Sequence, residues 1–472
     1  LNGGLFDHDF PKGNKIDFPK HIFEHLFEFL EQYNFTIDEN SPEDHEVGID
    51  PEMLGHIFEN LLEDNRDKGA YYTPKEVVHY MSQQSIIEYL KHNLDTDTKD
   101  IDDFVKGNVV SDFVKANHSL IKKLLKEVKV CDPAIGSGAF PMGVLKVTFT
   151  ALQNLHNAIS PNESFNEAKV KKDIIQKSIY GVDLEKGAVD IARLRFWLAL
   201  VVDEDKPQPL PNLDYKIMQG NSILEKFEDV DLSNLLKDEN EEIITAHKGQ
   251  VELPGFGRNQ SVFVFDSTTK EEFQSLIDLY FDFKVDTSYP YKTKQEVKAK
   301  INSIIEGKLK AKFALDKTKL QATLAEKQSH VKANTINTHD PKGVQDKKTK
   351  AVEKLNKEIE SLEYKIAHLS DILDRLNRWE HEEKERPYFL WHTYFKDIFD
   401  KGKFDIIIGN PPYIKEYTNR KAFDGIRESP YYMGKMDIWY FFACFCIDML
   451  KDNGGIQCLI AQSNWITSSG AA

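Results

Sequence analysis

Asn410, Pro411, Pro412 and Tyr413 form the stretch of this chain whose residue types best fit a chemical role. Asn410 brings a side-chain carbonyl acceptor, and the two prolines lack an N–H and have a fixed φ, which stiffens the loop and aims its carbonyls outward. Tyr413 adds an aromatic ring that can stack on a planar group. The combination predicts an acceptor site for a planar NH₂ group, whereas the alternative is a proline-rich turn that only ends a strand.

A second candidate site is a glycine-rich segment, which reads Asp132-Pro133-Ala134-Ile135-Gly136-Ser137-Gly138-Ala139-Phe140. It follows residues 127–131, which we expect to be a strand, and a helical pattern begins near Pro141. Glycines let a ligand approach the backbone because they have no Cβ, and strand, glycine turn and helix form a common cofactor-binding unit. The spacing matches neither the dinucleotide nor the triphosphate fingerprint, which disfavours both ligands.

Polar residues also follow two further predicted strands. Residues 178–182 lead to Asp183, whose carboxylate can accept both hydroxyls of a ribose or can cap the helix that we expect after it. Residues 215–218 lead to Asn221, which can bond an adenine edge or close an Asx turn. The residues themselves leave both alternatives open at each position.

The elements that must position these residues are short apolar runs. Residues 404–409 read as a buried parallel strand, and Asn410 follows its carboxyl end. Ligands of open α/β sheets bind at the carboxyl ends of the strands, so we expect the four loops at one edge. The pattern predicts an α/β fold with a Rossmann-like sheet.

Taken together and in this order, the motifs resemble those of the amino-group DNA methyltransferases that make N6-methyladenine from S-adenosylmethionine, in their γ-ordered class. The resemblance covers roughly residues 1–225 and 385–472. Residues 69–74 resemble the N-terminal cofactor segment of that class. Residues 1–6 and 54–59 resemble stretches of the fused type IIG restriction–modification enzymes and related phage-defence methyltransferases. The implied fold is a class I S-adenosylmethionine-dependent methyltransferase.

The resemblance also implies which residues form the site. The cofactor-binding set would be Tyr72, Thr73, Pro74, Asp132, Pro133, Ala134, Gly136, Ser137, Gly138, Phe140, Asp183, Leu184, Asn221 and Ser222. The catalytic set would be Asn410, Pro411, Pro412 and Tyr413. No Cys or His group has the spacing of a zinc site, and we expect no metal.

The implied reaction is methyl transfer to the N6 amine of an adenine that has flipped out of double-stranded DNA. Asn410 Oδ1 and the Pro411 carbonyl would accept the two amine hydrogens, and Tyr413 would stack on the base. The sulfonium methyl is already activated, so positioning dominates the rate. Two other classes stay open, a glutamine-N5 protein methyltransferase, whose amide presents the same NH₂ geometry, and a cofactor-binding scaffold without activity.

Composition limits which class of protein this chain can be and where it is located. The chain has 472 residues, four cysteines without a disulfide framework and a net charge of −16. With no signal peptide and no apolar run long enough for a membrane, we expect a cytoplasmic bacterial protein. The negative net charge is unfavourable for DNA binding, so the surface that binds DNA is either a local basic patch of this chain or lies in another part of the protein.

The chain begins at Leu1 and ends soon after a predicted strand at 454–460, so we expect a longer protein with a target-recognition domain and, as a further candidate, a nuclease domain.

The predicted domains are an N-terminal helical region at 1–100, the cofactor-binding half at 101–225, an insertion at 226–385 and the catalytic half at 386–472. The insertion carries a heptad of apolar residues, which are Val352, Leu355, Ile359, Leu362, Ile366, Leu369, Leu373 and Leu376. A looser helical stripe precedes it, formed by Ile301, Ile304, Ile305, Leu309, Phe313, Leu320 and Leu324. We expect an antiparallel coiled-coil hairpin at about 292–378. Residues 292–350 hold fifteen Lys and six acidic residues, which fits DNA or partner contact as well as a solvated surface.

Overall fold

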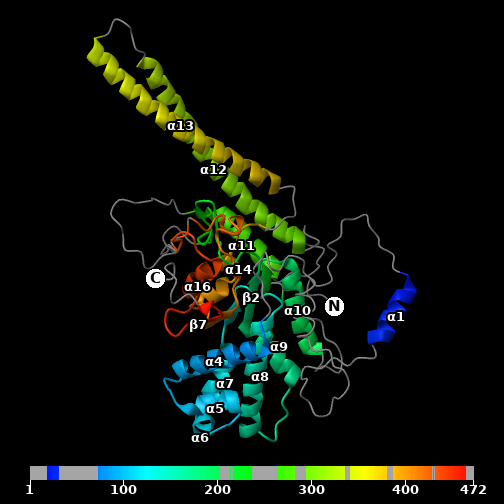
Figure 1. Ribbon diagram of the computed structural model, residues 1–472. Coiled ribbons are helices and arrows are strands. Elements are labelled where there is room, and N and C mark those ends of the chain that lie inside the picture. The colour runs from blue at the N-terminus through cyan, green and yellow to red at the C-terminus, as the bar shows by residue number, and fades with distance from the viewer. Residues whose placement is uncertain are drawn as a thin grey trace. The chain divides into compact units, whose positions relative to one another are not determined.

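The computed structural model describes residues 19–30, 73–201, 213, 216–236, 263–281, 294–334, 341–379, 386–427, 429 and 431–463. They divide into two compact units, Leu1–Phe263 with Arg386–Ala472, and Val264–Glu385 (Figure 1). The candidate residues that the structure describes all belong to the first unit. Tyr72 and the motifs at 1–6, 54–59 and 69–72 lie outside the described residues.

A five-stranded parallel sheet forms the centre of the first unit, with the strand order β3-β2-β1-β6-β7. Its strands are β1 Val130–Asp132, β2 Ile179–Asp183, β3 Ile217–Gln219, β6 Ile406–Gly409 and β7 Ile456–Leu459. The chain leaves β1 toward β2 and β3 on one side and returns to β6 on the other side. A topological switch point therefore lies between β1 and β6, where such folds bind ligands. The predicted Rossmann-like sheet is confirmed.

Alternate residues of the strands face two hydrophobic cores, as the period of two of a strand requires. Val130, Ile179 and Ile406 belong to one core, which also contains residues of seven helices. These helices are α4 Lys75–Asn93, α5 Lys99–Gly107, α6 Asp112–Ala116, α7 His118–Glu127, α8 Ala139–Ile159, α9 Glu167–Ser178 and α10 Lys186–Val201. Cys131 and Tyr180 belong to the other core, with α14 Trp391–Tyr394, α15 Lys396–Asp400 and α16 Ile438–Met449. The sheet is thus covered on both faces.

Two element boundaries differ from the sequence-based expectation. Glu127 ends α7 instead of starting the first strand, which begins only at Val130. Helix α8 begins at Ala139, so Pro141 lies in its first turn. Proline is tolerated there because the first N–H groups of a helix have no acceptor within the helix. The remaining elements of this unit are α1 Lys20–Leu30, the short pair β4 Lys226–Phe227 and β5 Val230–Asp231, and the 3₁₀ turn Lys421–Phe423.

The second unit consists of α11 Ser267–Phe281 and the two long helices α12 Lys294–Ala333 and α13 Lys342–Trp379, which lie side by side (Figure 1). Lys327 of α12 pairs with Glu358 of α13. Four apolar residues of α12 are buried, which are Ile301, Ile305, Leu309 and Phe313. On α13 the predicted heptad position Leu373 is only half-buried, whereas Ile372 is buried. Because a straight helix has about 3.6 residues per turn, its buried face shifts gradually relative to a strict seven-residue repeat. That the two helices form a coiled coil stays a prediction, as do the predicted domain boundaries.

No helix in the described ranges is both long enough and apolar enough to cross a membrane.

Candidate functional site

The loops after β1 and β6 meet at the carboxyl edge of the sheet. Gly409 ends β6 and lies against Asp132, which ends β1, because a Cβ on Gly409 would come within 2.6 Å of Asp132 Oδ1. Glycine is therefore required for this approach. The glycine-rich segment and the Asn410–Tyr413 segment consequently lie next to each other at the switch point.

The Asn410 amide is held from two sides. Its Nδ2 donates to Thr73 Oγ1 at 3.2 Å, and its Oδ1 lies 2.9 Å from the Tyr413 hydroxyl. Thr73 is buried and directly precedes Pro74, which caps α4. The N-terminal segment predicted to bind a cofactor thus contacts the predicted catalytic motif, and its bond to Nδ2 orients the Asn410 amide with Oδ1 toward Tyr413.

Among the described residues, two acceptors lie within reach of the single hydroxyl hydrogen of Tyr413. The hydroxyl lies 2.9 Å from Asn410 Oδ1 and 2.9 Å from the backbone carbonyl of Ile460. Burial, with a smaller contribution from Asp437, raises the pKa of Tyr413 to about 12, so the hydroxyl stays protonated at neutral pH. By rotating its hydrogen toward Ile460, Tyr413 can give up its own hydrogen bond to the Asn410 oxygen.

The glycine-rich turn wraps over the end of β2. The Ile135 N–H donates to the Val182 carbonyl at 3.1 Å, and Gly181 makes room for the Ile135 side chain, since a Cβ on Gly181 would come within 2.3 Å of it. Gly136 has a φ of +53°, and no atom lies within 4 Å of the place where its Cβ would be. The turn therefore has an open side at Gly136, which is free of side-chain bulk.

Asp183 connects the second strand to this turn. Its Oδ2 accepts the Gly136 N–H at 2.8 Å, and its Oδ1 accepts the Glu185 N–H at 2.9 Å. Burial raises the pKa of Asp183, and these two backbone bonds oppose the shift. The bond to Glu185 stabilises the turn between β2 and α10, which begins at Lys186, so Asp183 is not the N-cap residue of that helix. Each carboxylate oxygen keeps a further lone pair, so the ribose contact stays a prediction.

Asp132 is a buried carboxyl with one oxygen available. Its Oδ1 accepts the Ala134 N–H at 3.0 Å, whereas Oδ2 is buried without a hydrogen-bond partner among the described residues. Burial raises the pKa of Asp132 well above its usual range, and the neighbouring Asp183 raises it further. A ligand that brings a cation or an N–H group would favour the ionised carboxylate, whose Oδ2 would then accept from that group.

The loop after β3 is tied to the glycine-rich segment. Ser222 Oγ donates to the Pro133 carbonyl at 2.5 Å, which favours a positioning role for this hydroxyl. The Asn221 carbonyl accepts the Leu224 N–H at 3.2 Å, so the backbone and not the Asn221 side chain closes the turn. The Asx-turn alternative is therefore not realised within the described residues, and the Asn221 amide stays available for a ligand.

Two other predicted residues have contrasting environments. Leu184, after Asp183, is 58% exposed and offers an apolar surface at the carboxyl edge. Phe140 is buried in the hydrophobic core that α8 shares with α4, so it supports the turn from below.

Two arginines that the sequence reasoning missed bind backbone carbonyls, one at the glycine-rich turn and one at the start of β3. Arg195 of α10 is buried, and its Nη1 donates to the Ser137 carbonyl at 3.0 Å and to Ser137 Oγ at 3.2 Å. Arg193 donates to the Ile217 carbonyl at 3.0 Å through Nε. Their signal in the sequence was a pair of cations within the otherwise apolar run at 191–200.

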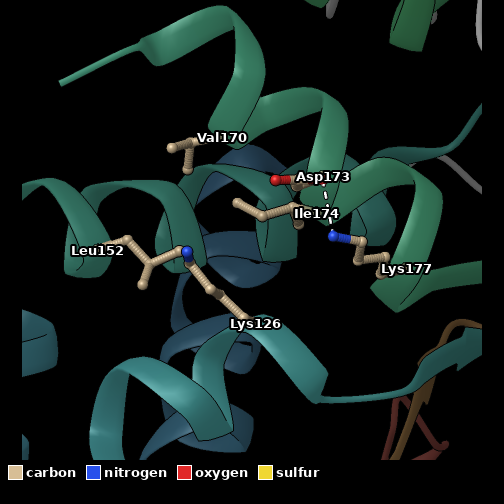
Figure 2. A pocket seen from close by; sticks show the side chains of 6 residues that line it. All are labelled: Lys126, Leu152, Val170, Asp173, Ile174 and Lys177. Carbon is tan, nitrogen blue, oxygen red and sulfur yellow. Dashed lines mark ion pairs between the residues drawn. The ribbon is translucent and has the colours of Figure 1, made fainter. Parts of the chain in front are cut away.

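A small hollow lies at the opposite end of β2. It holds about 50 Å³ and is lined by residues of α7, α8 and α9, which are Lys126, Leu152, Val170, Asp173, Ile174 and Lys177 (Figure 2). Lys177 pairs with Asp173 at 2.8 Å. Helix α9 ends where β2 begins, so the hollow is near the amino end of that strand. A volume of this size fits about two water molecules and no nucleoside.

No three His, Cys, Asp or Glu side chains come together as metal ligands in the part of the chain that the structure describes.

Known proteins match both halves of the sheet. The sequence profile of the MmeI DNA-methyltransferase domain matches residues 111–240, which include the glycine-rich turn, Asp183 and Asn221. A relative from Methanocaldococcus jannaschii, named as a type II restriction enzyme and methyltransferase, is 31% identical over 249 residues. The match covers 48% of this chain and 21% of the relative, so the chain spans about a fifth of that protein's length. The profile of the Eco57I restriction-modification methylases matches residues 177–472, which contain Asn410–Tyr413. The chain belongs to the Eco57I restriction-modification methylase family.

Proposed function

We propose that this chain transfers a methyl group from S-adenosylmethionine to the N6 amine of an adenine flipped out of double-stranded DNA. It would be the modification part of a restriction–modification or phage-defence protein, with target recognition by another part of the protein. The observation that carries the proposal is the Asn410 amide, held by Thr73 and Tyr413 beside the glycine-rich turn.

The residues at the switch point fit the cofactor. Asp132 Oδ2 is a buried acceptor without a partner among the described residues, which suits a cationic ligand group. Asp183 retains lone pairs for ribose hydroxyls, and the exposed Leu184 offers an apolar face to an adenine ring. Gly136 leaves open space for close approach. When bound, S-adenosylmethionine supplies a methyl group on a sulfonium, which is activated for transfer.

The acceptors of the catalytic motif fit the target amine. The lone pair of an adenine N6 amine is delocalised into the ring, which makes the amine a poor nucleophile. Asn410 Oδ1 and the Pro411 carbonyl would accept its two hydrogens and favour the pyramidal form, whose lone pair is localised. Tyr413 would turn its hydroxyl hydrogen to Ile460 when the amine arrives, and its ring would stack on the base.

No group of the motif is a strong base. The Asn410 amide does not titrate, and Tyr413, with a pKa of about 12, stays protonated. The amine proton would therefore leave after the new N–C bond has formed and N6 carries positive charge. Catalysis would then rest on positioning and on the fixed carbonyl dipoles.

Transfer of a radioactive methyl group tests the proposal. The full-length protein is incubated with tritiated S-adenosylmethionine and duplexes that contain adenine or lack it, and in parallel with protein substrates. We expect label only in adenine-containing DNA, as N6-methyladenine after digestion. Label in cytosine, or in protein glutamine, would overturn the proposal.

A further inference from the structure

The segment that follows the catalytic motif, residues 414–436, forms a closed loop, which we call the post-motif loop. The Ile438 N–H donates to the Ile414 carbonyl at 2.9 Å, and the Glu416 N–H donates to the Met436 carbonyl at 3.0 Å. The two ends of the loop are thus paired immediately after Tyr413. Any surface that the loop presents is therefore held in a fixed place relative to the catalytic motif.

A buried carboxylate organises the inside of the loop. Glu416 accepts hydrogen bonds from Arg427 Nε at 2.8 Å, from the Tyr432 hydroxyl at 2.8 and 2.9 Å, and from the Lys435 N–H at 3.1 Å. Arg427 also pairs with Asp424 at 2.8 Å. Charge-assisted bonds of this kind are among the strongest in proteins. They hold both arms of the loop, around Glu416 and around Tyr432, in one arrangement.

The outside of the loop is basic and carries two apolar side chains. In a chain of net charge −16, residues 414–436 hold five Lys or Arg and three Asp or Glu. Four of these cations are exposed, which are Lys415, Arg420, Lys421 and Lys435. Tyr417 is 76% exposed and Met433 is 73% exposed, and each directly adjoins a member of the Glu416 network. Exposed cations beside exposed apolar side chains match the two components of DNA, which are its phosphates and its bases.

The loop is also within reach of a bound duplex. Tyr417 is four residues from Tyr413, so at most about 14 Å of chain separate them. That length corresponds to about four base-pair steps at 3.4 Å each. A duplex that presents one base to Asn410 therefore passes within a few steps of this surface.

We propose that the post-motif loop binds the DNA duplex next to the flipped base. Its exposed cations contact phosphates, and Tyr417 and Met433 contact the bases or sugars where the target leaves the stack. This inference rests on the proposed function, because it assumes that DNA is the substrate. It assigns to this chain a DNA contact of its own, in addition to any made by a separate recognition domain.

A charge-removal variant of the full-length protein tests the phosphate contacts. We compare Arg420→Ala/Lys421→Ala with Lys122→Ala/Lys123→Ala, a matched pair of exposed neighbouring cations on α7. DNA affinity is measured between 50 and 200 mM salt. Each lost phosphate contact lowers the salt slope by about 0.9, so two lost contacts reduce the salt-induced loss of affinity about tenfold over this range. The α7 variant should keep the wild-type slope. An unchanged slope in the loop variant would overturn the proposal.

A second comparison tests the apolar contacts. The methylated site is first located in DNA from cells that express the full-length protein, and 2-aminopurine is then placed at the target position. Tyr417→Ala/Met433→Ala should reduce the fluorescence rise that accompanies flipping, whereas Tyr364→Ala, which removes a tyrosine of equal exposure on α13 (77%), should not. An equal rise in the loop variant and the wild type would contradict this role.

The outcomes separate the two claims. If the wild-type protein does not methylate adenine, but the salt slope falls in the loop variant and not in the α7 variant, the proposed function is rejected and the loop remains a DNA contact. Normal adenine methylation with an unchanged slope and unchanged flipping in both loop variants would reject the loop proposal alone.

Discussion

Asn410 derives its proposed role from its partners more than from its type. An asparagine after a strand is common in turns, and the contacts with Thr73 and Tyr413 hold its oxygen in one direction. These contacts come from segments 337 residues and 3 residues away in the chain. The motif was predictable from the types and order of its residues. The Thr73 contact was not predictable, because no local pattern relates residues so far apart.

Replacing Thr73 tests this arrangement. Thr73→Val keeps the shape of the side chain but removes the acceptor for Asn410 Nδ2. The loss of one hydrogen bond, roughly 0.5–1.5 kcal/mol, should lower kcat by about two- to thirteenfold. Thr73→Ser, which keeps the hydroxyl, should stay near the wild-type rate. Steady-state kinetics of the full-length protein on DNA measure this, and an unchanged kcat in Thr73→Val would refute the positioning role.

Asp132 provides a prediction about pH. Burial raises its pKa in the folded chain above the usual 3.8, so the folded state holds a proton where the unfolded chain has lost it. Without ligand, Asp132 therefore lowers the free energy of unfolding as pH rises above about 4. A cationic cofactor favours the ionised carboxylate, so binding should release protons and tighten as pH rises through the raised pKa.

Calorimetry in two buffers of different ionisation enthalpy counts these protons. In a series of pH values above the usual carboxyl pKa, we expect net proton release on binding of S-adenosylmethionine by the wild-type protein and less release by Asp132→Asn. Equal proton release by the two proteins would show that Asp132 does not respond to the ligand.

The order of the strands in the sheet determines where the candidate site lies. The chain returns from β3 to β6 on the other side of β1, and this reversal brings the glycine-rich turn beside the catalytic motif. The sequence predicted the strands and their polar ends, because short apolar runs bounded by turn residues are local patterns. It misplaced the start of β1, where Glu127 to Lys129 alternate in polarity as strands do, yet Glu127 completes α7.

Helix α10 contributes hydrogen bonds to the glycine-rich turn that no local sequence pattern predicts. Arg195 reaches the Ser137 carbonyl and hydroxyl from the helix behind the turn. Arg195→Ala should loosen the turn and weaken cofactor binding by roughly 1–3 kcal/mol, whereas Arg195→Lys should restore part of the affinity. Calorimetric titration with S-adenosylmethionine measures both, with circular dichroism as the check that each variant is folded. Wild-type affinity in folded Arg195→Ala would mean that these hydrogen bonds do not position the cofactor.

For the whole molecule, the structure explains how the first unit closes across a long insertion in its sequence. The chain leaves the first unit after Phe263 and returns to it at Arg386. Within the first unit, Glu225 and His392 are held together, because His392 Nδ1 lies 2.6 Å from Glu225 Oε2. The Phe389 N–H donates to the Leu224 carbonyl at 2.7 Å, and Trp391 Nε1 donates to the Ser222 carbonyl at 2.8 Å. The two ends of the insertion thus meet independently of what lies between them.

Deleting the second unit tests this independence. Replacing residues 264–385 with a short Gly/Ser linker should leave the affinity for S-adenosylmethionine within about twofold, because the contacts of Glu225 and Trp391 remain. Non-specific DNA affinity at low salt should fall if the lysines of α12 and α13 contact phosphates. Loss of cofactor binding would place the unit in the core fold, and unchanged DNA affinity would make those lysines a solvated surface.

The heptad and the stripe were visible in the sequence because helical periodicity is local. The closure between Glu225 and His392 was not visible, since it joins residues 167 positions apart.

Nucleoside mass spectrometry measures whether Asn410 is needed for methylation of an adenine amine. DNA is isolated from cells that express the full-length protein or its Asn410→Ala variant, and calorimetry verifies that both proteins bind S-adenosylmethionine. The wild type should produce N6-methyladenine, and the variant should produce none while binding the cofactor with nearly unchanged affinity, because the lost contact acts mainly in the transition state. Wild-type levels of N6-methyladenine in cells with Asn410→Ala would contradict the account.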